Sequence, residues 1–320
     1  MRTTTRPASY RDQQAWRESQ EFLSARLRLT DATAPREEFW NWRGHRVHLD
    51  RYPAAKAKVV PHHGVGTNGR QMSLILGAPP AKRGFETVAL DNLGHGLTQV
   101  RPGSTPSYDD GVDLVVDLLA REQSRDDRPI VLYGLSAGGM LTYHVAAKAP
   151  RGTLRGIVGM TFSDQRDQRV RDETSHDKLT ARAGVPLTGL LAKTPAASLT
   201  YPMSLASKMS ALADDPAAMK VLMKDRTSAA NRVGVRFLDS YATYTPAAEP
   251  PAFDACLVLL TQPAEDRWTP HHLSVPVLSR ITKVPVATVM LDNAGHYPLE
   301  EPGLTQMQDA IADFVTRNTA

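Results

Sequence analysis

The sequence predicts an α/β protein with a mostly parallel sheet flanked by helices. Short apolar segments rich in β-branched residues alternate with longer amphipathic segments over most of the 320 residues. Strands that alternate with helices form βαβ crossovers, which place neighbouring strands parallel. The alternation lapses from about residue 164 to 254 and then resumes. This length suits one large α/β domain with an insertion better than two independent domains.

The first part of the chain predicts an extension followed by a β-hairpin. Apolar residues recur at roughly helical spacing over 9–29, which predicts an amphipathic helix packed on the main body. An interfacial membrane helix is the alternative, but acidic residues interrupt the basic face that membrane binding favours. Residues 37–52 alternate large and polar side chains around Arg43-Gly44, which predicts two antiparallel strands joined by a turn.

The remaining core elements follow in regular order. Strands are predicted within 55–60 and at 85–90, 130–133, 154–163, 255–263 and 284–292. Helices are predicted at 69–84, 108–123, 140–149 and 270–282, and the last helix has one apolar face between Leu304 and Val315.

The lapse in alternation predicts three parts of the chain. Residues 164–252 contain a mixed-charge run followed by leucine- and methionine-rich helical segments without a strand pattern, which predicts a helical cap over the ends of the strands. Residues 1–35 form the helical extension, and residues 36–163 and 253–320 form the α/β core.

Composition excludes several classes of protein. The net charge of +4 is small and the basic residues are scattered, so no nucleic-acid footprint is expected. The single cysteine, Cys256, cannot form an intramolecular disulfide and is expected to be a buried strand thiol. No segment has the roughly 20 apolar residues that span a bilayer, and the N-terminus lacks an apolar signal region. A cytoplasmic location without stable membrane insertion is the expectation, and the N-terminal helix is a candidate surface for a homodimer.

One serine lies between a predicted strand and a predicted helix. Gly134-Leu135-Ser136-Ala137-Gly138 is a G-x-S-x-G pentad. A serine held at such a sharp turn has a strained backbone and needs small neighbours, and the next helix directs its partial positive charge toward it. The pentad therefore indicates a nucleophile, although a Gly/Ser turn also arises for packing alone.

A serine hydroxyl requires a base and a group that orients the base. His296 follows the last predicted strand, where its ring can reach the same edge of the sheet. Asp266 follows the preceding strand and gives the chain order serine, aspartate, histidine. Glu265 and Asp164 are the competing acids, but the Asp164 loop also opens the cap and serves as a linker.

Acyl transfer also needs donors for the developing oxyanion. The backbone N–H of Ala137, directly after the serine, is one candidate. The loop PHHGVGTNG supplies the second: Val65 N–H is the candidate, with Gly64 N–H as the alternative, while a plain tight turn is the structural interpretation. The adjacent side chains of His62 and His63 are expected to diverge, which disfavours a metal site.

These motifs together resemble the α/β-hydrolase superfamily. HHGVG, DNLGHG, GLSAGG, PAEDRWTP and NAGHYPLEEP occur in the order and at the topological positions that this family uses. The chain looks most similar to serine esterases of the lysophospholipase or monoacylglycerol-lipase type. Two features depart from the family pattern: the long N-terminal extension, and TQPAED before Asp266, where a glycine is common.

The resemblance implies an α/β-hydrolase fold, with a mostly parallel eight-stranded sheet, flanking helices and an inserted helical cap. It implies Ser136, Asp266 and His296 as a catalytic triad, Val65 and Ala137 as oxyanion donors, and no metal or organic cofactor. The expected activity is hydrolysis of small apolar, weakly charged carboxylic esters through an acyl-enzyme on Ser136. The alternatives on the same triad are lactonase, thioesterase, C–C bond hydrolase, acyltransferase and slow-turnover ligand receptor.

Overall fold

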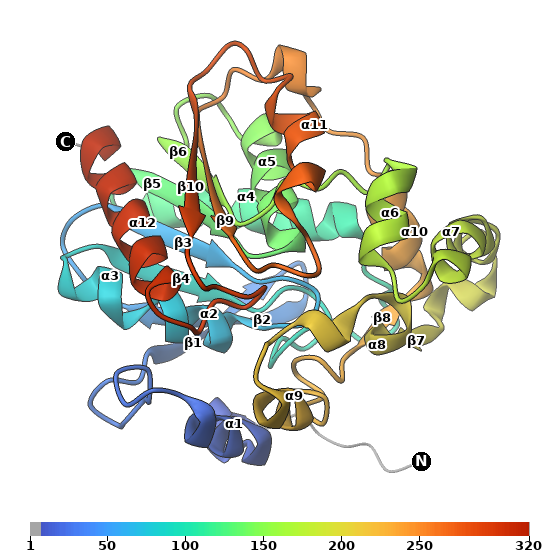
Figure 1. The fold of residues 1–320 in the computed structure, drawn as a ribbon, viewed down its shortest axis with the longest axis horizontal. Coiled ribbons are helices and arrows are strands. Elements are labelled where there is room, and N and C mark those ends of the chain that lie inside the picture. The colour runs from blue at the N-terminus through green and yellow to red at the C-terminus, as the bar shows by residue number, and fades with distance from the viewer. Residues whose placement is uncertain (1–7, 320) are drawn as a thin grey trace.

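The computed structural model describes residues 8–319 and places eight strands in one sheet (Figure 1). The strand order is β1-β2-β4-β3-β5-β6-β9-β10, with β1, β2 and β4 paired antiparallel and all other neighbours parallel. The strand bounds are β1 Arg36–Trp42, β2 His45–Tyr52, β3 Lys58–His62, β4 Glu86–Leu90, β5 Ile130–Gly134, β6 Gly156–Gly159, β9 Leu257–Pro263 and β10 Val286–Leu291. The predicted mostly parallel eight-stranded sheet is confirmed.

Helices cover both faces of this sheet (Figure 1). One layer contains α2 (Gly69–Leu76), α3 (Ala78–Lys82) and α12 (Gly303–Thr319), which contact one another. The other contains α4 (Tyr108–Arg125) and α5 (Ala137–Lys148). The helix predicted at 69–84 breaks at Gly77 because the Tyr52 ring occupies the space where a side chain would lie. The helix predicted at 270–282 forms only a 3-10 turn, His271–Leu273, and α11 (Val275–Leu278).

The segment between β6 and β9 lies to one side of the sheet (Figure 1). Its helices are α6 (Gln168–Thr174), α7 (Lys178–Leu191), α8 (Met203–Ala206), α9 (Pro216–Leu222) and α10 (Val235–Thr243), with 3-10 turns at Pro195–Ser198, Met209–Ala211 and Pro250–Ala252. It also contains an antiparallel strand pair that the sequence did not predict, β7 (Thr200–Pro202) with β8 (Arg232–Gly234). Each of these strands has three residues, too few to show an alternating pattern.

The N-terminal extension does not form the single helix expected over 9–29. It forms 3-10 turns at Tyr10–Asp12 and Gln20–Phe22 on either side of α1 (Gln14–Ser19). The helix ends where the Ser19 hydroxyl donates to the Trp16 carbonyl, a local bond that competes with continued helix. Trp16, Leu23 and Leu27 nevertheless join the hydrophobic core, and α1 contacts α9 (Figure 1). The first seven residues of the predicted extension lie outside the described residues.

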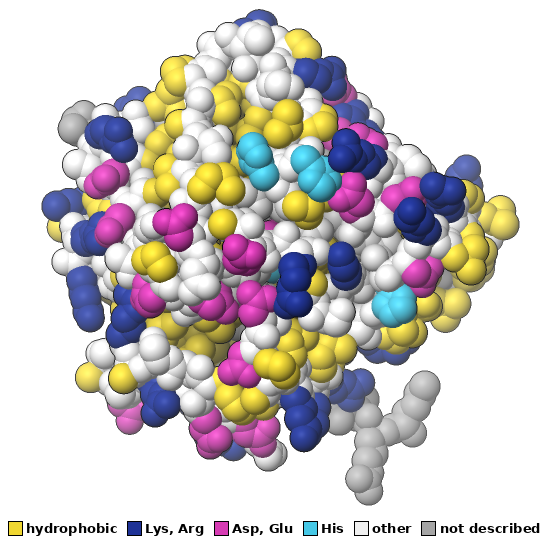
Figure 2. All heavy atoms as spheres, in the orientation of Figure 1, with side chains coloured by type: hydrophobic (Ala, Val, Ile, Leu, Met, Phe, Trp, Pro, Cys, Tyr) yellow, Lys and Arg dark blue, Asp and Glu magenta, His cyan; other side chains and the backbone are white. Residues whose placement is uncertain are grey.

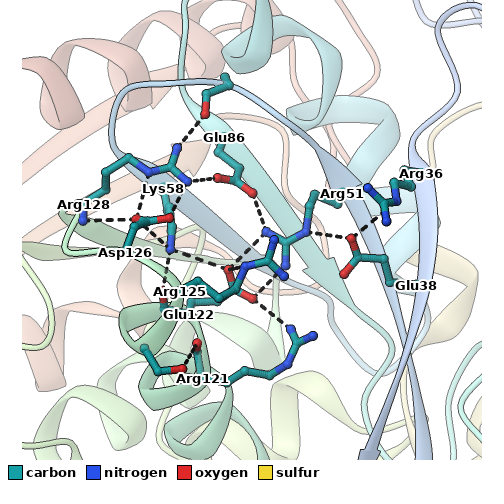
Figure 3. A network of polar contacts seen from close by, with 12 residues as sticks. Arg36, Glu38, Arg51, Lys58, Glu86, Arg121, Glu122, Arg125, Asp126 and Arg128 are labelled. Carbon is teal, nitrogen blue, oxygen red and sulfur yellow. Dashed lines mark hydrogen bonds and ion pairs between the residues drawn. The ribbon is translucent and has the colours of Figure 1, made fainter.

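A buried ion network closes the end of the sheet where β3 and β4 begin (Figure 3). Arg51 is 2% exposed and donates from Nη2 to Glu122 Oε1 at 2.7 Å, and it also pairs with Glu86. Lys58 is fully buried and lies 3.0 Å from Asp126 Oδ1. Charges so completely removed from water require such partners, because an unpaired buried charge is strongly destabilising. The network therefore locks the amino ends of the central strands to the end of α4.

Candidate active site

Ser136 lies on a strained turn between β5 and α5. Its φ of 55° and ψ of −126° fall in a region that non-glycine residues rarely occupy. The turn requires glycine at position 134, because an added Cβ there would lie 2.0 Å from the Gly138 carbonyl oxygen. The turn faces a cavity that Ser136 and Ala137 help to line. The pentad thus forms a tight elbow that exposes a serine at the carboxyl end of a central strand.

Asp266 and His296 lie in contact at the neighbouring strand ends. Asp266 follows β9 and His296 follows β10, and these strands pair in parallel, so both residues leave the same edge of the sheet. His296 Nδ1 lies 3.0 Å from Asp266 Oδ2 and 3.1 Å from Oδ1. Both side chains are fully buried. A carboxylate in this position fixes the ring tautomer and stabilises an imidazolium.

A turn of its own holds the Asp266 carboxylate. Oδ1 accepts the backbone N–H groups of Trp268 and Thr269, each at 2.8 Å, and Oδ2 accepts the Thr269 hydroxyl at 2.8 Å. Burial by itself would raise the pKa of Asp266, but the charge and hydrogen bond of His296, with the Thr269 donors, outweigh it and lower the pKa to about 2. The side chain therefore stays ionised across the neutral range.

Trp268 and Thr269 are site residues that the sequence reasoning missed. The Trp268 ring lies against the His296 ring with centroids 4.5 Å apart, and its indole N–H donates to the Thr174 carbonyl at the end of α6. An aspartate followed at two and three positions by residues that close an Asx-turn was the available signal in EDRWT. Trp268 thereby links the histidine to the segment beside the sheet.

His296 Nε2 is buried and makes no hydrogen bond to any of residues 8–319. Ser136 Oγ and this nitrogen are not directly hydrogen-bonded. Ser136, Trp268 and Thr269 nevertheless line the same cavity, which brings the serine to the Asp266–His296 pair. Catalytic hydrogen bonds of this kind often tighten only when substrate is bound.

The loop after β3 lies directly against Ser136. A Cβ added to Gly64 would lie 2.8 Å from Ser136 Cβ, so only glycine permits this approach. The Gly64 N–H already donates to Thr67 Oγ1 at 3.0 Å. Within the part of the chain that the structure describes, the N–H groups of Val65 and Ala137 make no hydrogen bond, and both residues line the cavity with Ser136. Two unengaged donors therefore border the serine.

The competing acids are engaged or distant. Asp164 is paired with Arg166 through bonds of 2.7 to 3.1 Å, and Arg166 also binds Glu249. Glu265 is exposed to solvent. The structure therefore brings only Asp266, of these three candidates, to His296.

His62 and His63 do not diverge as expected. Their rings stack with centroids 5.3 Å apart and planes 17° apart. Each Nδ1 approaches a backbone carbonyl, that of His63 at 3.0 Å and that of Gly64 at 2.7 Å, and these bonds turn both rings to the same side. His63 Nε2 accepts the Asn92 N–H, so this ring braces the loop after β4 against the loop after β3.

One group of potential metal ligands occurs among the described residues. Single atoms of Glu37, His48 and Asp50 lie within 4.8 Å of one another. Arg70 donates to both carboxylates, at 2.7 Å to Glu37 and 2.6 Å to Asp50. Burial would lower the pKa of His48, but Asp91 and the other nearby carboxylates raise it to about 10, which keeps the ring protonated. A protonated histidine and two carboxylates paired with arginine are poor metal ligands.

The cavity beside Ser136 has a volume of about 390 Å³. The core contributes the serine side, and the segment between β6 and β9 contributes most of the opposite wall, including leucines of α7. Leu179, Leu187 and Leu190 of α7 are also more than half exposed, and Figure 2 shows hydrophobic side chains at the edge where Figure 1 places α7. Among the described residues, every helix is too short or too polar to cross a membrane.

Comparisons with known proteins agree with this architecture. Lipase LipV of Mycobacterium tuberculosis is 33% identical over 106 residues, which span 32% of this chain and 37% of that lipase. The monoacylglycerol lipase of Paleococcus ferrophilus has a TM-score of 0.62 at 17% identity, covering 88% of this chain and 99% of that one. A soluble variant of the Saccharomyces cerevisiae monoglyceride lipase has a TM-score of 0.67 at 16% identity, with coverages of 92% and 97%. These structural likenesses show the fold.

A model of the alpha/beta hydrolase family matches residues 59–313, which include the elbow, the loop after β3 and the Asp266–His296 pair. The match spans most of the chain, in agreement with the strand order and the position of the elbow after β5. The chain therefore belongs to the alpha/beta hydrolase family.

Proposed function

We propose that this protein is a serine hydrolase that cleaves carboxylic esters through an acyl-enzyme on Ser136. The observation that carries the proposal is the buried Asp266–His296 pair beside a strained serine elbow. Its support is chemical, because a hydroxyl nucleophile, a histidine base and an orienting carboxylate are the groups that acyl transfer requires. Matches to proteins named as lipases support an ester rather than another acyl substrate.

In this mechanism the Ser136 oxygen attacks the ester carbonyl carbon while His296 Nε2 takes the hydroxyl proton. The oxyanion of the tetrahedral intermediate accepts the N–H groups of Val65 and Ala137, since Gly64 N–H is already donated to Thr67. The intermediate then releases the alcohol, which receives the proton from His296. Water activated by the same nitrogen hydrolyses the acyl-enzyme. Asp266 remains ionised and stabilises the imidazolium in both steps.

The proposed substrates are small, apolar and weakly charged esters, such as medium-chain or monoacylglycerol esters. The cavity wall supports this choice, because leucine, valine and methionine side chains dominate it on the side away from Ser136. Residues 164–252 act in this proposal as a cap that sets acyl-chain preference.

The test uses a fluorophosphonate probe and a series of p-nitrophenyl esters of increasing chain length. The unaltered chain should be labelled, and Ser136→Ala should abolish both labelling and turnover while its thermal unfolding midpoint stays unchanged. Rates should rise with chain length until the acyl group fills the cavity. Persistent labelling of Ser136→Ala, or negligible rates across ester, thioester and lactone substrates, would contradict the proposal.

A further inference from the structure

The N-terminal segment 10–16 lies against the loops that frame the candidate site. This segment precedes the part of the chain that the family model matches. Its Tyr10, Gln13 and Trp16 side chains are all buried, and α1 contacts α9 (Figure 1). Residues 10–16 are called the strap below. The strap therefore reaches both the sheet and the proposed cap.

The loop that carries Val65 is held from the cap side by a turn at 225–228. Ser228 Oγ donates to the Gly66 carbonyl at 2.8 Å, directly after Val65. Asn68 Nδ2 donates to the Thr227 carbonyl at 3.1 Å, while its Oδ1 caps α2 by accepting Gln71 N–H at 3.0 Å. These groups are buried, so each bond lost would leave a polar atom without water.

Gln13 fixes that turn from the other side. Its Nε2 donates at 2.6 Å to Asp225 Oδ1 and at 2.6 Å to Thr227 Oγ1. Asp225 is only 5% exposed, and burial raises the pKa of its carboxyl. A buried carboxylate depends on its donors, and in this turn the strap supplies one across 212 positions of sequence.

Tyr10 acts on the other end of the loop, through Asp91. The Tyr10 hydroxyl lies 3.0 Å from Asp91 Oδ1 and 2.9 Å from Oδ2, and this carboxylate also accepts the N–H of Gly69 at 2.7 Å. Gly69 is the first residue of α2, immediately after the loop. The Arg70 guanidinium lies over the Tyr10 ring, 4.8 Å from its centroid. The strap thus contacts the supports at both ends of the Val65 loop.

We infer that Tyr10 and Gln13 are positioning residues that hold the Val65 N–H where the oxyanion forms. The inference rests on the proposed function, because it assigns the strap to the acyl-transfer step. An oxyanion donor contributes to the transition state more than to substrate binding. Loosening the strap therefore lowers kcat and weakens binding of a tetrahedral mimic, while KM changes little.

The experiment compares Gln13→Leu and Tyr10→Phe with a control, Gln14→Leu. Leucine keeps most of the glutamine volume without its donor, phenylalanine removes only the hydroxyl, and Gln14 is exposed and bonds only to Glu18. Each variant is assayed on one p-nitrophenyl ester well below its unfolding temperature. Its inhibition constant is measured with an alkyl trifluoromethyl ketone, which forms a tetrahedral adduct with the serine.

Because loss of a whole oxyanion donor costs about 10²–10³ in kcat, displacement of one should cost about tenfold. Gln13→Leu is expected to lower kcat by about tenfold and weaken the ketone by a similar factor, with KM within about twofold; Tyr10→Phe should follow with a smaller change. Kinetics equal to those of Gln14→Leu, or an equal loss of KM and ketone affinity, would overturn the inference alone. An unaltered chain that neither binds the ketone nor turns over esters would overturn the proposed function with it.

Discussion

The contact between Gly64 and Ser136 gives a sharp test of the site geometry. In Gly64→Ala the new Cβ would lie 2.8 Å from Ser136 Cβ, 3.1 Å from the Leu135 carbonyl oxygen and 3.4 Å from Ser136 Oγ. Gly64 does not have a positive φ, so alanine fits its backbone conformation. The perturbation therefore acts through contact with the nucleophile rather than through backbone strain.

The size of the displacement sets the expected loss. Ordinary van der Waals contact begins near 3.4 Å, so the loop and the serine must separate by about 0.6 Å. Because a misplacement of about 1 Å can cost 10²-fold in rate, kcat/KM should fall about ten- to thirtyfold. The fluorophosphonate labelling rate should fall with it, since both reactions use the same hydroxyl and the same oxyanion donors.

The control is Gly234→Ala, where an added Cβ meets nothing within 4 Å. Both variants are purified, their unfolding midpoints are measured, and kcat/KM is taken on one ester at a temperature where both are folded. A Gly64→Ala variant that keeps kcat/KM within twofold of Gly234→Ala would refute the close approach of this loop to Ser136.

Three further results are expected. Asp266→Asn removes the carboxylate charge 3.0 Å from His296 Nδ1, so kcat on the ester should fall by roughly 10³–10⁴, and a loss under tenfold would exclude an orienting role. Because Asp266 and Asp91 have a pKa lowered from 3.8 to about 2 in the folded chain, their contribution to stability is present above pH 3.8 and is lost as pH falls toward 2; urea unfolding across that window should show the decline. Glu122→Gln should lower the free energy of unfolding by about 3 kcal/mol, whereas Asp113→Asn, in partly exposed ion pairs, should cost under about 1 kcal/mol; equal effects would contradict the importance of the buried network.

Local patterns predicted the fold wherever the deciding interactions lie close in sequence. The turn at Arg43-Gly44 has φ values of 49° and 82°, as expected where a hairpin needs left-handed residues. Strand and helix alternation likewise predicted the sheet. The break at Gly77 could not be predicted, because it depends on the Tyr52 ring packed there by the tertiary structure.

The same distinction holds for the candidate site. Ser136, Asp266 and His296 each follow a strand, and parallel strands direct their carboxyl ends to one edge, so their proximity could be predicted from chain order. Gln13 lies more than 200 positions from Asp225, and no periodicity links them. Long-range contacts of irregular segments leave no local signal, which is why the strap emerged only from the structure.

The position of the ion network in Figure 3 has a consequence for how this molecule can change. The network lies where β3 and β4 begin, and the elbow lies where β5 ends, so the two occupy opposite ends of the central strands. Substitutions in the cavity wall need not disturb the charges that close the far end. For protein engineering, the loops around Ser136 can be randomised to alter substrate selectivity while the arginines and glutamates of the network are kept as a fixed foundation.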